Sequence, residues 1–121
     1  MVEIDRGYLL VALALGLAGM LLGFYMGIAA DNKLQTVHVA LVLPGFVTLA
    51  IYAFVFRLWP ELKRAPLAAV QFWTATVGAV AIVVGSYFFV TAGSVPIVAI
   101  GSLLAIVAVA LLLWQAWEYA K

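Results

Sequence analysis

One side chain in this sequence, the imidazole of His38, could bind a metal or a cofactor from within a long apolar stretch. It is the only histidine among 121 residues, and it follows Gln35-Thr36-Val37. A ligand-capable polar side chain inside a membrane span is a functional-site hypothesis by default, because burying it without a partner costs free energy. Two interpretations are open from the residue alone. His38 is either a hydrogen-bonded structural group or an axial ligand of a haem or another metal.

A second candidate ligand and a set of glycines lie on the preceding apolar stretch. Met26 is the only other conventional haem ligand that we expect near the depth of His38, although a methionine in a span usually packs. Gly19, Gly23 and Gly27 are spaced four apart and so share one helical stripe. Small residues at this spacing favour close contact between helices, and they would also leave room for a flat macrocycle. Met26, Gly23 and Gly27 are therefore candidate cofactor contacts.

The stretch that contains His38 is interrupted near its middle by Pro44-Gly45. Proline in a helix interior removes a backbone hydrogen bond, so we expect a loosened ladder and a kink there. Gly45 lies seven residues after His38, and Tyr52 lies fourteen residues after His38. These spacings place all three on one face of a regular helix. That face is either a cofactor wall, with Gly45 as a contact, or an ordinary packing surface.

Several other classes of site are disfavoured. The chain has no cysteine, glycine-rich phosphate loop or zinc-ligand spacing, and one histidine cannot build a multi-histidine metal site. No pair of carboxylates lies within a span, which disfavours a proton relay or an ion-coupled transporter. A net charge of +1 gives no indication of nucleic-acid binding. The polar residues Gln71 and Thr74 are expected to hydrogen-bond neighbouring helices or their own backbone.

Composition places these residues in a lipid bilayer. The chain is 69% hydrophobic and 9% charged, with a mean hydropathy of +1.26, beyond what a soluble core of this size can bury. About 20 apolar residues cross a bilayer, and the sequence offers such stretches at about 7–30, 34–58, 65–92 and 95–117. We therefore predict an all-α membrane protein in which residues 1–121 form a single domain, a bundle of four transmembrane helices.

The distribution of positive charge predicts the orientation. The side that holds both termini and the second loop carries five basic residues, namely Arg6, Arg57, Lys63, Arg64 and Lys121. The opposite side carries only Lys33. By the positive-inside rule both termini face the cytoplasm, so His38 enters from the outer face. At 1.5 Å rise per residue it should lie roughly one turn below that surface.

Three segments of the chain resemble a known family. The segments are Thr36-Val37-His38-Val39-Ala40 continued through Tyr52 to Glu61, then Gln71-Phe72-Trp73 into Gly78, and Gly19-Met20 through Ala29. The segment with His38 resembles the second helix of haem-copper oxidase catalytic subunits, closest to the nitric oxide reductase large subunit and the cbb-type oxidases. The segment that begins at Gln71 resembles the third helix of these subunits, and the segment that begins at Gly19 resembles the first. Small four-helix bacterial proteins described as oxidase-subunit-I-like are also similar.

This resemblance implies that His38 is an axial ligand of one b-type haem on the outer side of a bacterial inner membrane. The expected role is electron transfer or sensing. The chain departs from the small proteins' His-x-His-x-Asn pattern, because Ala40 and Val42 occupy the second and third places. The histidines of the active site have no counterpart either, so we do not expect oxygen or nitric oxide reduction by this chain alone.

One histidine leaves the second axial position of a six-coordinate haem to be filled. Two chains can each supply His38 across a two-fold interface, or Met26 or a partner protein can supply the other ligand. Otherwise no haem is bound, and the protein is a structural or accessory subunit of a larger respiratory membrane complex. A homo-oligomer or a complex subunit, embedded in lipid, is expected in either case.

Overall fold

The computed structural model describes residues 3–119, all of whose regular structure is helical; Lys121, which the charge argument uses, lies outside them. The elements are α1 (Ile4–Ala29), α2 (Gln35–Ala40), the π-helical η1 (Leu41–Val47), α3 (Thr48–Leu58), the 3₁₀ helix η2 (Pro60–Arg64), α4 (Ala68–Ala92) and α5 (Pro96–Tyr119). Because α2, η1 and α3 run on without a break, they form one span, and the part of the chain described has four helices long and apolar enough to cross a membrane. The predicted all-α fold with four long apolar helices is confirmed.

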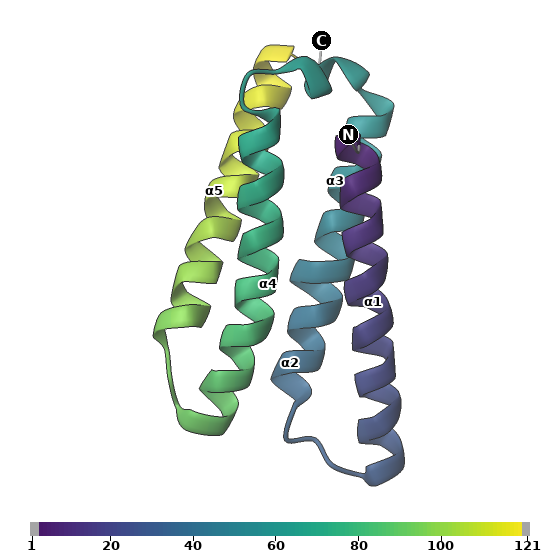
Figure 1. Cartoon of the computed structure of the whole chain (residues 1–121), viewed down its shortest axis with the longest axis vertical. Helices are drawn as coiled ribbons and strands as arrows, with labels where there is room; N and C mark the ends of the chain where they lie inside the picture. The colour runs from purple at the N-terminus through teal and green to yellow at the C-terminus, as the bar shows by residue number, and fades with distance from the viewer. Residues whose placement is uncertain (1–2, 120–121) are drawn as a thin grey trace.

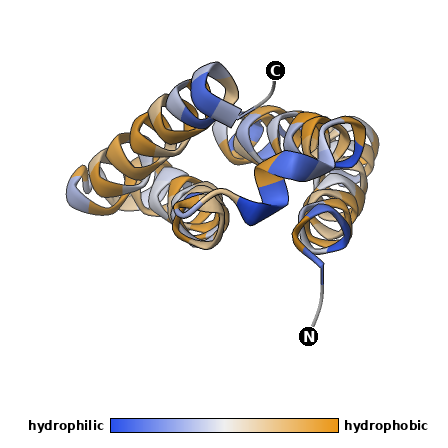
Figure 2. Ribbon diagram, turned by 90° about the horizontal axis from the view of Figure 1, so that it is seen from above, coloured by the Kyte–Doolittle hydropathy of each residue, from blue (hydrophilic) through white to orange (hydrophobic). Residues whose placement is uncertain are grey.

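The four spans associate as two hairpins. In Figure 1, α1 lies along α2, η1 and α3, and α4 lies along α5. The start of α1 and the end of α5 are at the same end of the molecule, next to η2 (Figure 1). Seen from that end, η2 is the most hydrophilic element and crosses between the two hairpins (Figure 2). The polar connection thus lies where a bilayer would give way to water.

The two helices of the second hairpin approach through glycines. A Cβ added to Gly85 would lie 2.3 Å from the backbone nitrogen of Val98, and one added to Gly101 would lie 2.7 Å from that of Ile82. Backbone atoms therefore occupy the space that side chains at these positions would need. Small residues let helices approach closely, and the resulting van der Waals packing drives helix association in lipid. The hydrophobic effect gives no driving force there, because lipid tails are as apolar as the side chains.

The interruption predicted at Pro44 takes the form of the π-helix η1. Proline has no N–H to donate, and its ring clashes with the carbonyl four residues earlier in an α-helix. A π-helical stretch widens the turn to an i→i+5 pattern and so accommodates both defects. The segment also contains Gly45, which is buried against Leu15 of α1; a Cβ there would lie 3.0 Å from Leu15 Cδ1.

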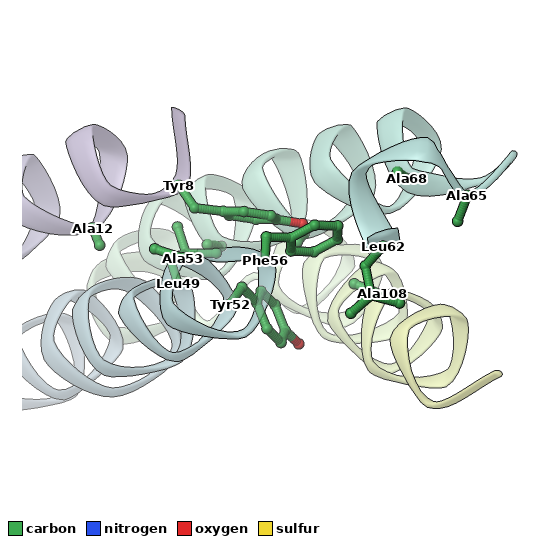
Figure 3. Packing of buried hydrophobic residues seen from close by; sticks show 12 residues of the cluster. Tyr8, Ala12, Leu49, Tyr52, Ala53, Phe56, Leu62, Ala65, Ala68 and Ala108 are labelled. Atoms are coloured by element: carbon green, nitrogen blue, oxygen red, sulfur yellow. The ribbon is translucent and has the colours of Figure 1, made fainter. Parts of the chain in front are cut away.

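An aromatic cluster joins the hairpins near the end that holds η2 (Figure 3). The ring of Tyr8 is fully buried, with its centroid 5.4 Å from that of Tyr52 and 4.8 Å from that of Phe72. Leu62 of η2, also fully buried, closes the cluster from the loop side. Tilted and edge-to-face aromatic contacts add stabilisation beyond area burial. The largest fully buried hydrophobic side chains, Tyr8, Phe56, Leu49 and Leu62, all belong to this cluster.

Candidate functional site

His38 lies on α2 and reaches across to the backbone of α1. Its Nδ1 is 2.8 Å from the carbonyl oxygen of Gly19. A carbonyl oxygen only accepts, so Nδ1 carries the proton and donates it. The other ring nitrogen, Nε2, has no hydrogen-bond partner within residues 3–119, and the side chain is half-buried. In the neutral imidazole Nε2 therefore holds the free lone pair.

Gly23 provides the space that the imidazole occupies. A Cβ at this position would lie 2.7 Å from Cε1 of His38 and 3.2 Å from Nδ1. The ring thus packs against the bare backbone of α1 with Cε1 nearest to Gly23, and it reaches the carbonyl one turn earlier. Gly23 was predicted as a cofactor contact, and in the structure it contacts the imidazole of His38.

The depth of His38 differs from the sequence expectation. Its partners Gly19 and Gly23 lie well inside α1, which continues to Ala29. At 1.5 Å per residue, Gly23 lies about 9 Å from the end of that helix. The predicted depth of one turn counted only the start of α2, whereas α1 extends further in the same direction (Figure 1). His38 is therefore level with Gly19–Gly23 instead of with Met26.

Met26 has a different environment. Its side chain is 7% exposed and lines a pocket of about 540 Å³ with Tyr25, Lys33 and Tyr87. His38 is not among the residues that line this pocket. Within one chain, the structure does not bring the two candidate ligands to a shared cavity.

The predicted glycine cradle for a macrocycle is absent between α1 and the second span. A Cβ on Gly19 would lie 2.9 Å from Cγ2 of Val42, and Gly23 is covered by His38, so side chains fill this seam. Gly27 has no atom within 4 Å of its would-be Cβ and is exposed. Gly45 faces Leu15. These glycines pack helices or face outward, and a flat cofactor does not fit between α1 and α2.

The face that was predicted to unite His38, Gly45 and Tyr52 is also divided. His38 lies against α1, whereas Tyr52 lines a groove shared with α4 and α5. The π-helix between them changes the helical repeat, so a spacing of fourteen residues no longer keeps Tyr52 on the stripe of His38. His38 and Gly45 thus both lie against α1, whereas Tyr52 also lines the groove.

Two polar groups inside the bundle form a link between the hairpins. The hydroxyl of Tyr8 donates to Oε1 of Gln71, and Nε2 of Gln71 donates to the carbonyl of Ala108 at 3.3 Å. Gln71 is fully buried, so both halves of its amide are engaged. The prediction that Gln71 bonds neighbouring helices is confirmed. Tyr8 was missed, although a tyrosine within an apolar run is itself a signal of a buried hydroxyl partner.

An ion-pair cluster fastens the start of α1 to the second loop. Asp5 accepts from Arg57 at 3.2 Å and pairs with Lys63 at 3.0 Å, and Lys63 also reaches Glu3 at 3.2 Å. The hydrogen bond to the Asp5 carboxylate, with a smaller contribution from Glu3, raises the pKa of Lys63. Sequence reasoning counted Lys63 only as a topology signal. Nothing in the sequence pairs positions so far apart.

Among the residues described, no three His, Cys, Asp or Glu side chains gather as a metal site, which leaves His38 as a single-ligand candidate. The resemblance to haem-copper oxidase catalytic subunits rests on the residues quoted for it. Comparison of the chain with models of protein families, with curated proteins and with solved structures finds no match.

Proposed function

We propose that this chain binds one b-type haem through Nε2 of His38 and serves in electron transfer or sensing, without reducing oxygen by itself. The observation that carries the proposal is the 2.8 Å hydrogen bond from Nδ1 to the Gly19 carbonyl. A backbone carbonyl bonded to one ring nitrogen fixes the tautomer and orients the ring, as it does for metal-binding histidines. A bound haem would supply reversible one-electron transfer.

The close packing of α1 against α2 determines the side from which a haem can approach His38. Because no flat group fits between these helices, the cofactor approaches the half-buried edge of His38 from outside the single chain. A second copy then supplies the other axial ligand, also from His38, across a two-fold interface. The proposal thus includes a homodimer with one haem for two chains.

The proposed setting is a bacterial inner membrane with both chain ends in the cytoplasm. Five basic residues against one support this orientation. His38 then lies in the outer half of the bilayer. Electrons would be exchanged with a partner at that face.

An absorption spectrum of the purified protein, oxidised and then reduced with dithionite during haemin titration, tests the proposal. We expect sharp reduced α and β bands that saturate at one haem per two chains. The glutamine in His38→Gln can still donate a hydrogen bond to the Gly19 carbonyl, but it is a poor iron ligand. The variant protein should therefore remain folded and lose the α and β bands. Met26→Leu, the matched control, should keep them. Full haem content in folded His38→Gln protein would exclude this ligand.

The second candidate is a haem-free structural or accessory subunit of a larger respiratory membrane complex. It is favoured by the packing of His38, since one ring nitrogen is bonded and the ring packs against Gly23. Under this interpretation the visible spectrum stays flat after haemin addition, and His38→Ala lowers only the stability of the protein. The same titration therefore separates the two candidates.

A further inference from the structure

A groove that no part of the haem proposal uses opens between the hairpins. It has a volume of about 540 Å³ and lies between η1 and α3 on one side and α4 and α5 on the other. Its lining includes Pro44, Tyr52, Ala75, Ala79, Ala105 and Leu113. Leu113 at the rim is 70% exposed, so the groove is open to the lipid-facing surface. Its size is that of a small-molecule site, too small for a partner helix about 10 Å across.

One polar group in this groove has no partner. Tyr52 is 95% buried, given its 5% exposure, and its hydroxyl makes no hydrogen bond to any residue from 3 to 119. Figure 3 shows that hydroxyl directed away from Tyr8 and Phe56. The other hydroxyl in the lining, that of Thr48, already donates to the Leu43 carbonyl at 2.9 Å. The groove therefore presents one free donor in an otherwise apolar setting.

A phenol hydroxyl surrounded by hydrocarbon is stabilised when it meets an acceptor, because leaving it unpaired costs free energy. The small side chains of Ala75, Ala79 and Ala105 leave room between the helices for a planar molecule. We propose that the groove binds a flat, lipid-soluble ring compound with a carbonyl oxygen at its edge, a chemistry that quinones represent. Tyr52 donates to that carbonyl, and the alanine walls cover the ring.

This site is independent of the haem proposal. Tyr52 follows His38 by fourteen residues, which corresponds to about 21 Å along a helix. Loss of the histidine ligand should leave the groove unchanged, and blocking the groove should leave the haem spectrum unchanged. Failure of one proposal is thus distinguishable from failure of the other.

The test is equilibrium dialysis of 1,4-naphthoquinone against the protein in lipid nanodiscs, with naphthalene as the ring that lacks an acceptor. The absence of cysteine removes the thiols that a quinone would alkylate. Tyr52→Phe deletes only the hydroxyl, which has no partner to lose, so the fold should be retained. Tyr25→Phe, at a 58% exposed tyrosine outside the groove, is the matched control.

We expect saturable binding at one naphthoquinone per chain. Tyr52→Phe should weaken it about three- to tenfold, the effect of one net hydrogen bond, and Tyr25→Phe should leave it unchanged. Naphthalene should bind no better to the native protein than to Tyr52→Phe. Equal naphthoquinone affinity in the native and Tyr52→Phe proteins, or uptake that never saturates, would overturn the proposal.

Discussion

The imidazole of His38 fills the space that a side chain at position 23 would need. Cε1 of His38 lies 2.7 Å from where the Cβ of a residue at Gly23 would be, closer than two carbon atoms can approach. The histidine and the glycine therefore form one unit, in which the missing side chain on α1 gives the ring access to the Gly19 carbonyl. This relationship holds whether or not a haem is bound.

Gly23→Ala should lower the free energy of unfolding by about 1–3 kcal/mol, because the ring must move and its bond to Gly19 weakens. Gly27→Ala is the control, since its Cβ would meet nothing within 4 Å. The midpoint of denaturation in mixed micelles measures both. Equal midpoints for the two variants would show that the ring relocates without cost.

Gly85→Ala should destabilise more than Gly23→Ala. The obstacle at position 85 is the backbone nitrogen of Val98 at 2.3 Å, whereas the obstacle at position 23 is a side chain that can rotate. Backbone cannot yield without separating α4 from α5, so we expect a loss of about 3 kcal/mol or more. The same denaturation assay gives the ranking. A smaller effect at position 85 would mean that this hairpin packs more loosely than described.

Tyr8→Phe and Gln71→Leu should each cost about 0.5–2 kcal/mol, the range for hydrogen bonds between membrane helices. Each removes one partner from the bond between the Tyr8 hydroxyl and Gln71. The double variant should cost less than the sum, and a double-mutant cycle measures that coupling. Tyr87→Phe, at a 46% exposed tyrosine, is the neutral control. Strict additivity would argue against a direct bond.

The cluster around Lys63 predicts a pH dependence at the alkaline end. Its pKa is raised from the ordinary value of 10.5, chiefly by the hydrogen bond to Asp5, so the folded state holds this proton more tightly than the unfolded state. The contribution to stability is thus fully present below about pH 10.5 and is lost as pH rises through the raised pKa.

Lys63→Met removes that dependence, and Lys33→Met, on the opposite loop, is the control. The difference in unfolding midpoint between native protein and Lys63→Met should be constant from pH 7 to pH 9 and shrink above about 10.5. A difference that stays constant through the alkaline range would show that Lys63 contributes by packing alone.

The fold was largely predictable because hydropathy and span length are local properties. Uninterrupted apolar runs fix the number of spans, and the buried amide of Gln71 had to find partners on neighbouring helices. The site was less predictable. The sequence cannot show that α1 extends past the start of α2, so His38 was expected level with Met26 although it lies level with Gly19 and Gly23.

Contacts between residues far apart in the sequence could not be predicted for a similar reason. Nothing local relates Tyr8 to Gln71 or Asp5 to Lys63, which meet only after the hairpins have packed. The glycines of α1 illustrate the point on one helix. Their spacing is uniform, yet Gly23 contacts the imidazole of His38 while Gly27 faces outward. The reason is that the last turn of α1 extends beyond the first residue of α2 and is not covered by it.

The π-helix at Leu41–Val47 behaves as a one-residue insertion in an otherwise α-helical span. One residue corresponds to about 100° of rotation in an α-helix. The insertion therefore changes the angle between the two halves of the span, so that His38 lies against α1 while Tyr52 lines the groove. Deleting a single residue here would restore a uniform α-helical phase and rotate Tyr52 relative to His38 at the loss of only one side chain. The direction in which each half faces is thus encoded by chain length as much as by residue type.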